Sequence, residues 1–174
     1  MKNSIIILAI FAILFTPLNA QAVSSMTRIN NQVSVQEQEE AQQPWERIAI
    51  TILKALGHFE QSEPSKGAVL LIDAVLFYKP EVGFEGIEEK LLSAKKHFLK
   101  DEYSKGSKYV VEVIETIKQA SGIDSVKSSE QSVSKADAVK DLFWNSMNYF
   151  RHGYPAQGMI GILEALVLLT GPKG

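Results

Sequence analysis

Apolar residues recur at helical spacing in three segments of the chain, and each segment ends in a phenylalanine. Counting back from Phe59, Phe98 and Phe150, small or apolar residues stand four, seven and eleven positions earlier, which places them on one face of a helix. These columns are Ala55/Ala94/Ser146, Ile52/Leu91/Phe143 and Ile48/Ile87/Val139, and a further apolar column six positions before is Leu53/Leu92/Trp144. No segment alternates as a strand would, so the pattern predicts an all-α protein.

The same three segments continue into a second apolar stretch after a glycine. Eight positions beyond each phenylalanine stand Gly67, Gly106 and Gly158. The columns that follow are apolar or small: Leu71/Val110/Ile162, Ile72/Val111/Leu163, Ala74/Val113/Ala165 and Val75/Ile114/Leu166. A glycine in this position allows the second helix to approach the first closely. Each segment is therefore predicted to form a helical hairpin.

The predicted helices span 45–61, 65–78, 84–100, 104–119, 133–151 and 156–169. They form hairpins at about 45–80, 84–119 and 133–170, within a single domain over 44–171. Pro44 marks a start, Pro80 and Gly83 a break, and Gly171-Pro172 an end. The polar run 121–135 is predicted to be a flexible loop, and residues 23–43, rich in Gln and Glu, a disordered leader.

The first residues have the layout of a secretory signal peptide. Lys2 precedes an apolar run from Ile5 to Phe15, and Pro17 and the small residues Ala20 and Ala22 follow. An apolar run of about 11 residues is too short for a membrane span, which needs about 20. We expect cleavage after Ala22 and export to the periplasm or the medium. The alternative is an N-terminal membrane anchor, which the polar run after it disfavours.

The hairpin pattern resembles the tetratricopeptide repeat, a helix-turn-helix unit of about 34 residues. In that family small residues stand where Ala55, Ala94 and Ser146 stand, an aromatic follows three positions later, and an alanine-like pair spaced by seven lies in the second helix. Here those positions hold His58, His97 and Tyr149, then Gly67/Ala74, Gly106/Val113 and Gly158/Ala165. Glycine replaces the usual alanine, and only Pro80 matches the proline that ends a repeat. The resemblance implies a protein-binding scaffold.

The charges of the three second helices argue against an open stack of repeats. In such a stack the middle repeat is covered on both sides and should be the most apolar. Here the outer helices 68–78 and 159–169 carry Asp73 and Glu164, one acidic residue each, while the middle one is amphipathic. A helix that is apolar all round must be covered all round. We predict that the first and third hairpins close into a compact bundle; the alternative is a homodimer through Met159–Leu169.

Composition narrows the possible partners and chemistry. Removal of the signal peptide, with Lys2, leaves 17 basic and 20 acidic residues without a cationic run, so nucleic acid is a poor partner. The chain has no cysteine, which excludes disulfides and thiolate metal sites. No nucleophile motif or phosphate-binding glycine loop is found. We expect neither an enzyme nor a cofactor.

Two sets of titratable residues are candidates for ligand binding. His58 and His97 occupy equivalent repeat positions and are candidate metal ligands, although they lack the EXXH or HEXXH spacing typical of such sites. The other set, Asp73, Glu112 and Glu164, stands six positions after each glycine. These carboxylates could converge on a cation, mark the wet side of each helix, or bond to a neighbouring helix.

Aromatic residues gather in the third segment, where Phe143, Trp144, Tyr149, Phe150 and Tyr154 follow helical spacing. Core packing explains most of them, and a binding surface through Trp144 and Tyr154 is the alternative. The sequence thus predicts an exported, non-catalytic module that binds a protein or peptide. The alternative is a periplasmic helical bundle that binds a metal ion or small ligand.

Overall fold

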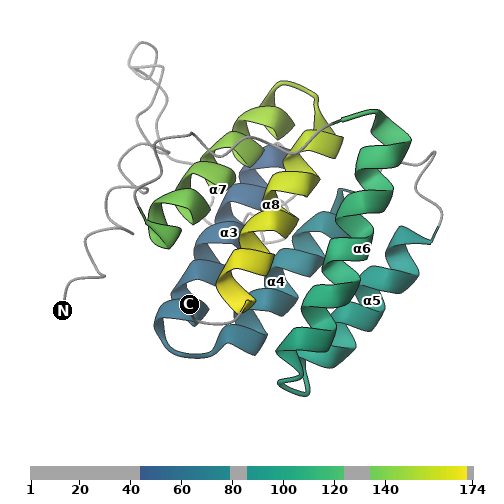
Figure 1. Cartoon of the computed structure of the whole chain (residues 1–174). Helices are drawn as coiled ribbons and strands as arrows, with labels where there is room; N and C mark the ends of the chain where they lie inside the picture. The colour runs from purple at the N-terminus through teal and green to yellow at the C-terminus, as the bar shows by residue number, and fades with distance from the viewer. Residues whose placement is uncertain (1–43, 79–85, 124–133, 172–174) are drawn as a thin grey trace, which may run out of the picture. The chain divides into compact units, whose positions relative to one another are not determined.

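The computed structural model describes residues 44–78, 86–123 and 134–171, and over these it is all-helical (Figure 1). The helices are α3 (Pro44–Glu60), α4 (Pro64–Phe77), α5 (Ile87–Phe98), α6 (Tyr103–Ser121), α7 (Lys135–Arg151) and α8 (Pro155–Thr170). The predicted all-α class is confirmed, and the predicted helix boundaries differ from these by at most three residues.

Several predictions concern residues outside the described ranges. They are the signal peptide 1–22, the leader 23–43, the break at Pro80 and most of the loop 121–135, of which 124–133 is not described. Within the described ranges, α6 extends to Ser121, and α7 begins after Ser134, whose hydroxyl accepts a bond from the Asp137 amide at 3.1 Å. A search of the described helices finds none long and apolar enough to cross a membrane.

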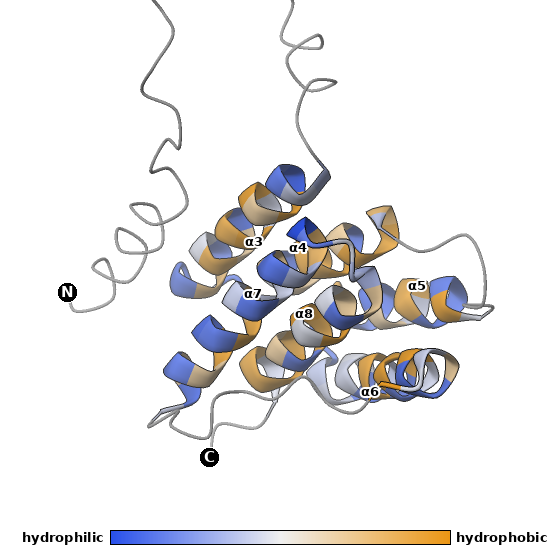
Figure 2. Ribbon diagram, turned by 90° about the horizontal axis from the view of Figure 1, so that it is seen from above, coloured by the Kyte–Doolittle hydropathy of each residue, from blue (hydrophilic) through white to orange (hydrophobic). Residues whose placement is uncertain are grey.

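Helices that follow one another in the chain pack together, α3 with α4, α5 with α6 and α7 with α8. Further contacts join α4 to α5 and to α8, α6 to α8, and α3 to α7. The pair α4 and α8 therefore lies between α3 and α7 on one side and α5 and α6 on the other, as Figure 2 shows from above.

This position explains the composition of α4 and α8. Both are apolar on most sides because both have neighbours on most sides. Burial differs within one repeat column. Ile72 of α4 and Leu163 of α8 are fully buried, whereas Val111 at the same position of α6 is 43% exposed. The helices α4 and α8 contact each other, and α6 at the edge is amphipathic.

The turn between α7 and α8 lies at the opposite end of the helices from the other two turns (Figure 1). Ser65, at the start of α4, bonds to Tyr103, at the start of α6, with 2.8 Å between their oxygens, so the first two turns are adjacent. The rings of Tyr78, after α4, and Phe150, near the end of α7, lie 4.6 Å apart at the other end. The last helix pair thus runs in the reverse sense.

The buried residues match the predicted helix face. Positions four, seven and eleven before each phenylalanine are all buried. The column six positions before does not belong to the core, because Leu92 is 48% and Trp144 is 42% exposed. Six residues correspond to a rotation of about 600°, which puts this column well to the side of the buried face.

Most of the apolar side chains of Met159–Leu169 pack inside the chain, and Val167, Leu168 and Leu169 are partly exposed. Met159, Ile160, Ile162, Leu163 and Leu166 are at most 1% exposed, against α4, α6 and α7. Contacts within the chain therefore cover most of the segment for which a partner chain was the alternative. The homodimer itself stays a prediction.

Candidate functional site

The three turns share one backbone conformation. The third residue after each phenylalanine, Ser62, Asp101 or Gly153, has a positive φ of 61°, 59° or 79°. The next amide donates to the carbonyl five residues earlier in each turn, at 2.8 to 3.0 Å. Only the third turn has glycine, the residue for which this conformation carries no steric cost. The polar cluster described below is built on the first two turns.

The repeat glycines meet the repeat phenylalanines at close range. A Cβ atom added to Gly67 or Gly158 would lie 2.6 Å from the ring of Phe59 or Phe150, and one on Gly106 would lie 2.9 Å from the ring of Phe98. These distances are too short for any side chain, so the predicted close approach of the two helices is confirmed. This contact fixes the two helices on either side of each turn close to one another.

A triplet of titratable side chains, one histidine, one glutamate and one lysine, joins the two sides of each of the first two turns, and we call it the turn clamp. In the first turn, Nδ1 of His58 lies 2.8 Å from Oε2 of Glu63, and Nζ of Lys66 donates to Oε1 at 2.6 Å. In the second, His97 lies 2.5 Å from Glu102, and Lys105 donates to it at 3.0 Å. In each glutamate, one carboxylate oxygen therefore contacts the histidine of the helix before the turn, and the other accepts from the lysine of the helix after it.

The turn clamp shifts the pKa of its carboxylate downward. The hydrogen bond from His97, followed by that from Lys105, lowers the pKa of Glu102 from 4.5 to about 2. The hydrogen bond from Lys66, followed by that from His58, lowers the pKa of Glu63. Hydrogen bonds to the charged form of an acid favour that form. Both glutamates are therefore ionised at neutral pH and act as acceptors, not as acids.

The third turn replaces the clamp by an aromatic pair. Tyr149 and Tyr154 occupy the positions of the histidine and the glutamate, and their rings meet edge to face with centroids 6.5 Å apart. Gln157 stands where the other turns have lysine. Since this turn also lies at the other end of the helices, the charged cluster is confined to the first two turns.

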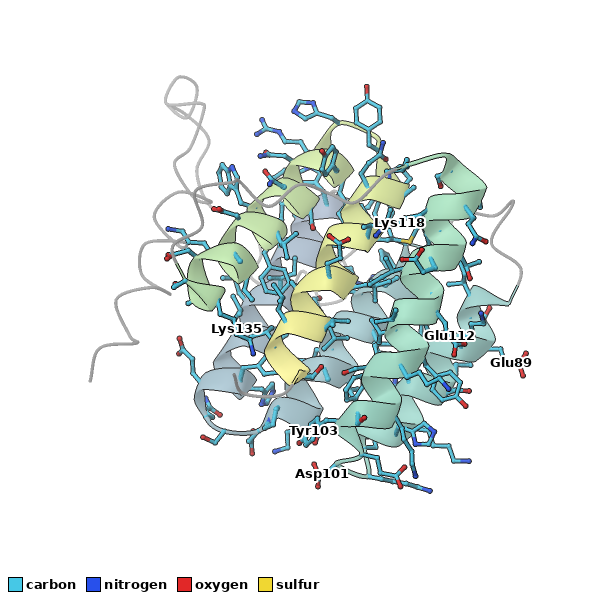
Figure 3. All side chains as sticks on the ribbon, in the orientation of Figure 1. Glu89, Asp101, Tyr103, Glu112, Lys118 and Lys135 are labelled. Atoms are coloured by element: carbon cyan, nitrogen blue, oxygen red, sulfur yellow. The ribbon has the colours of Figure 1, made fainter. Side chains whose placement is uncertain are left out.

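A second group of hydrogen bonds connects these two turns. The hydroxyl of Ser65 donates to a carboxylate oxygen of Asp101, and the hydroxyl of Tyr103 donates to the same oxygen at 2.8 Å. The two hydroxyl oxygens lie 2.8 Å apart. The bond from Ser65, ahead of that from Tyr103, lowers the pKa of Asp101, whereas burial raises the pKa of Tyr103. Figure 3 shows Asp101 and Tyr103 together at this end.

The acidic residues Asp73, Glu112 and Glu164 each form an ion pair with a lysine of a neighbouring helix. Nζ of Lys95 on α5 donates to both oxygens of Asp73 at 2.6 and 2.9 Å. Lys90 on α5 lies 3.7 Å from Glu112, and Lys118 on α6 lies 3.3 Å from Glu164. The three carboxylates are thus engaged separately, which agrees with the third role considered for them, a bond to a neighbouring helix.

Among these carboxylates Glu164 is the one with the least exposed side chain, 20%. Burial raises the pKa of Glu164, and the bond from Lys118 opposes this effect in part. The ion pair therefore does not fully compensate for the lost hydration of the carboxylate. Figure 3 shows Lys118 on the side of α6 that faces α8.

The two aromatic candidates are both accessible. Trp144 on α7 is 42% exposed, and Tyr154, before α8, is 54% exposed. Of the other aromatic residues in this segment, Phe143 and Phe150 are buried. The segment therefore serves both the core and the surface, and Trp144 and Tyr154 remain candidates for binding.

Sequence reasoning missed two features of this surface. Glu63 and Glu102 were not among the candidates, although His, Glu and Lys recur with the same spacing in His58–Lys66 and His97–Lys105. The exposed Phe77, Leu92 and Leu99 were also missed, although Leu92 stands in an apolar repeat column. The glutamates could have been found from the repeat columns. The exposure of the apolar residues could not, because it depends on which side of each helix packs against another helix.

Among the described residues, no three His, Asp or Glu side chains are grouped so that they could hold a metal ion. Comparison of the chain with protein-family models, with curated proteins and with solved structures finds no match. The functional argument therefore depends on the surface of the molecule itself.

Proposed function

We propose that the chain is an exported, non-catalytic helical-repeat protein that binds a protein or peptide partner. Its three TPR-like hairpins close into a bundle by contact of the first with the third. The observation that carries the proposal is the exposure of large apolar side chains. Six of them in the described residues are 42–62% exposed: Phe77, Leu92, Leu99, Val111, Trp144 and Tyr154. Aromatic and large apolar side chains provide most of the affinity in protein interfaces.

Two further observations support the proposal. The three turns have one backbone conformation and the same glycine–phenylalanine contact, as expected for copies of one unit. The titratable side chains of the turn clamp are bonded to one another, and both glutamates of the clamp have lowered pKa values. Such groups stabilise turns and are poor general acids.

A selection of displayed peptides against the exported, immobilised chain tests this proposal. We expect an enriched family of peptides that binds the purified protein, and weaker binding after substitution of one or more of the six exposed apolar residues by serine. Control substitutions are Lys108→Ser and Lys140→Ser, at exposed positions of α6 and α7. No enrichment over the uncoated support, from libraries that cover helical and extended peptides, would contradict the proposal.

The alternative, a bundle that binds a metal or small ligand, has one observation in its favour. The imidazoles of His58 and His97 are each oriented by a carboxylate, as metal-binding histidines commonly are. Under this alternative, Zn²⁺ or Ni²⁺ raises the melting temperature, and His58→Ala/His97→Ala abolishes the effect. Under the proposed function the double variant still binds the selected peptides.

A further inference from the structure

The middle of α4 is joined to α5 by an ion pair, which gives their register. Lys95 donates to both carboxylate oxygens of Asp73. The two helices are antiparallel, because Ser65 at the start of α4 bonds to Asp101 just after the end of α5. Moving one turn toward the end of α4 therefore means moving one turn toward the start of α5.

This register brings exposed apolar residues together on both sides of the ion pair. One turn beyond Asp73, Leu76 and Phe77 come alongside Leu92; one turn before it, Val69 comes alongside Leu99. Phe77, Leu92 and Leu99 are 51, 48 and 62% exposed, and Val69 and Leu76 are partly exposed. The register thus places these apolar residues on both sides of the ion pair, within about two helical turns.

The other border of this surface is basic. The guanidinium of Arg47 on α3 lies over the ring of Phe77, 4.4 Å from its centroid. Lys54 lies two turns further along the same side of α3 and is exposed. We call the surface formed by Arg47, Lys54, Phe77, Leu92 and Leu99, with the Asp73–Lys95 pair, the α4 face.

The α4 face carries more positive than negative charge, although the chain as a whole has a formal charge of −2. Asp73 is compensated by Lys95, so Arg47 and Lys54 give a positive excess. With Glu88, an exposed carboxylate one turn before Leu92, included, the excess is one positive charge. An apolar strip beside a basic border is complementary to an acidic amphipathic helix, whose apolar side covers the strip and whose carboxylates meet the border.

We propose that the α4 face binds an acidic amphipathic helix of a partner protein. This inference rests on the proposed function and names the chemistry of the partner. Leu92 and Leu99 are one heptad apart, so they match apolar residues of the partner helix spaced by three, four and seven positions. The guanidinium of Arg47, already held over Phe77, is placed to bond a partner carboxylate beside the aromatic ring.

The test uses two labelled helical peptides with the same leucine stripe, one with flanking glutamates and one with flanking lysines. Fluorescence anisotropy with the full exported chain is expected to give binding at least about tenfold tighter for the acidic peptide, and weaker with added salt. Amide chemical-shift changes are expected along α3, α4 and α5. The variants Arg47→Glu/Lys54→Glu and Leu92→Ser/Leu99→Ser are each expected to weaken binding at least about tenfold.

The matched control is Lys108→Glu/Lys140→Glu, which makes the same change of charge as Arg47→Glu/Lys54→Glu at exposed positions of α6 and α7. It is expected to bind the acidic peptide as the wild type does, and circular dichroism checks the fold of every variant. Equal affinity for both peptides, or an unchanged affinity in the α4-face variants, would overturn the inference. So would binding to vesicles of anionic phospholipid that Arg47→Glu/Lys54→Glu abolishes, with no peptide binding.

Failure of this inference can be separated from failure of the proposed function. Peptides enriched by selection that shift the amides around Trp144 and Tyr154 but not those of α4 would overturn the α4-face proposal alone. Absence of binding in both experiments would overturn both.

Discussion

Gly158 and Gly57 show how different two glycines in helices can be. A Cβ atom on Gly158 would lie 2.6 Å from the ring of Phe150, whereas one on Gly57 would meet nothing within 4 Å. Glycine in a helix costs about 0.5–1 kcal/mol of stability relative to alanine. At Gly158 the ring of Phe150 leaves no space for the methyl group of alanine.

Substitution of these glycines by alanine is expected to have opposite effects. Gly158→Ala should lower the free energy of unfolding by about 1–3 kcal/mol, because the packed ring must move. Gly57→Ala should raise it by about 0.5–1 kcal/mol, because the helix gains propensity without a clash. Urea unfolding followed by circular dichroism measures both. Stabilisation by both substitutions would contradict the close packing.

Single residues also account for the difference between the first two turns and the third. Ser62 and Asp101 adopt a positive φ that costs a residue with a side chain about 1–2 kcal/mol, and Gly153 avoids this cost. The turn clamps bond both sides of the first two turns, where the third has only an aromatic pair. The first two turns therefore rely on their side chains to hold this conformation.

At the scale of an element, the second turn clamp links the end of α5 to the start of α6. The pKa of Glu102 is about 2 in the folded chain and 4.5 as the ordinary value. A group whose pKa is lowered by folding contributes stability above its unfolded pKa and loses it as the pH falls through the folded value. Between about pH 4.5 and 2 this contribution should disappear.

Glu102→Gln is therefore expected to lower the melting temperature at neutral pH, and the difference from the wild type should shrink as the pH falls from about 4.5 toward 2. Thermal unfolding at several pH values measures this difference. Glu89→Gln, at an exposed position in the first turn of α5, is the control and should change the melting temperature little at neutral pH. A difference for Glu102→Gln that stays constant down to about pH 3 would contradict the role of the clamp.

The elements also differ in how much of their burial the pattern predicts. The columns on the inner side of each first helix are buried as expected, because a helical face with period 3.6 has to face a neighbour. In the column Ile72, Val111 and Leu163, burial differs although all three residues are apolar. The difference comes from the contact between α4 and α8, in which α6 has no part.

For the whole molecule, the reverse direction of the last helix pair is the feature to test. The hydroxyl groups of Ser107, near the start of α6, and Thr170, at the end of α8, lie 2.9 Å apart. The natural chain has no cysteine, so introduced cysteines report on this arrangement alone. Gln157, at the other end of α8, is 13 residues from Thr170, or about 20 Å along the helix.

The double variant Ser107→Cys/Thr170→Cys is expected to form an intramolecular crosslink with a short bis-maleimide, without loss of helical content. Ser107→Cys/Gln157→Cys is expected not to react in this way, because its cysteines are at opposite ends. Mass spectrometry of the digested monomer distinguishes the two. A crosslink only in the second pair would mean that α8 runs in the other direction.

Much of the fold could be predicted from the sequence because it depends on local periodicity. The helices, the shared turn and the glycine–phenylalanine contact follow from residues a few positions apart, such as Phe150 and Gly158. The acidic candidates were found by their repeat positions, but their lysine partners were not. Asp73 and Lys95, for example, are 22 positions apart, and no repeat column relates them.

The sequence by itself determined the helices, their apolar sides and the spacing of the turns, since these depend on neighbours along the chain. Only the tertiary structure decided which helix sides are covered, because that depends on contacts between distant segments. It buried Leu163 and left Val111 exposed at one repeat position. It also placed Phe77, Leu92 and Leu99 around the Asp73–Lys95 pair, since the register of α4 against α5 is set by side chains that meet only after folding.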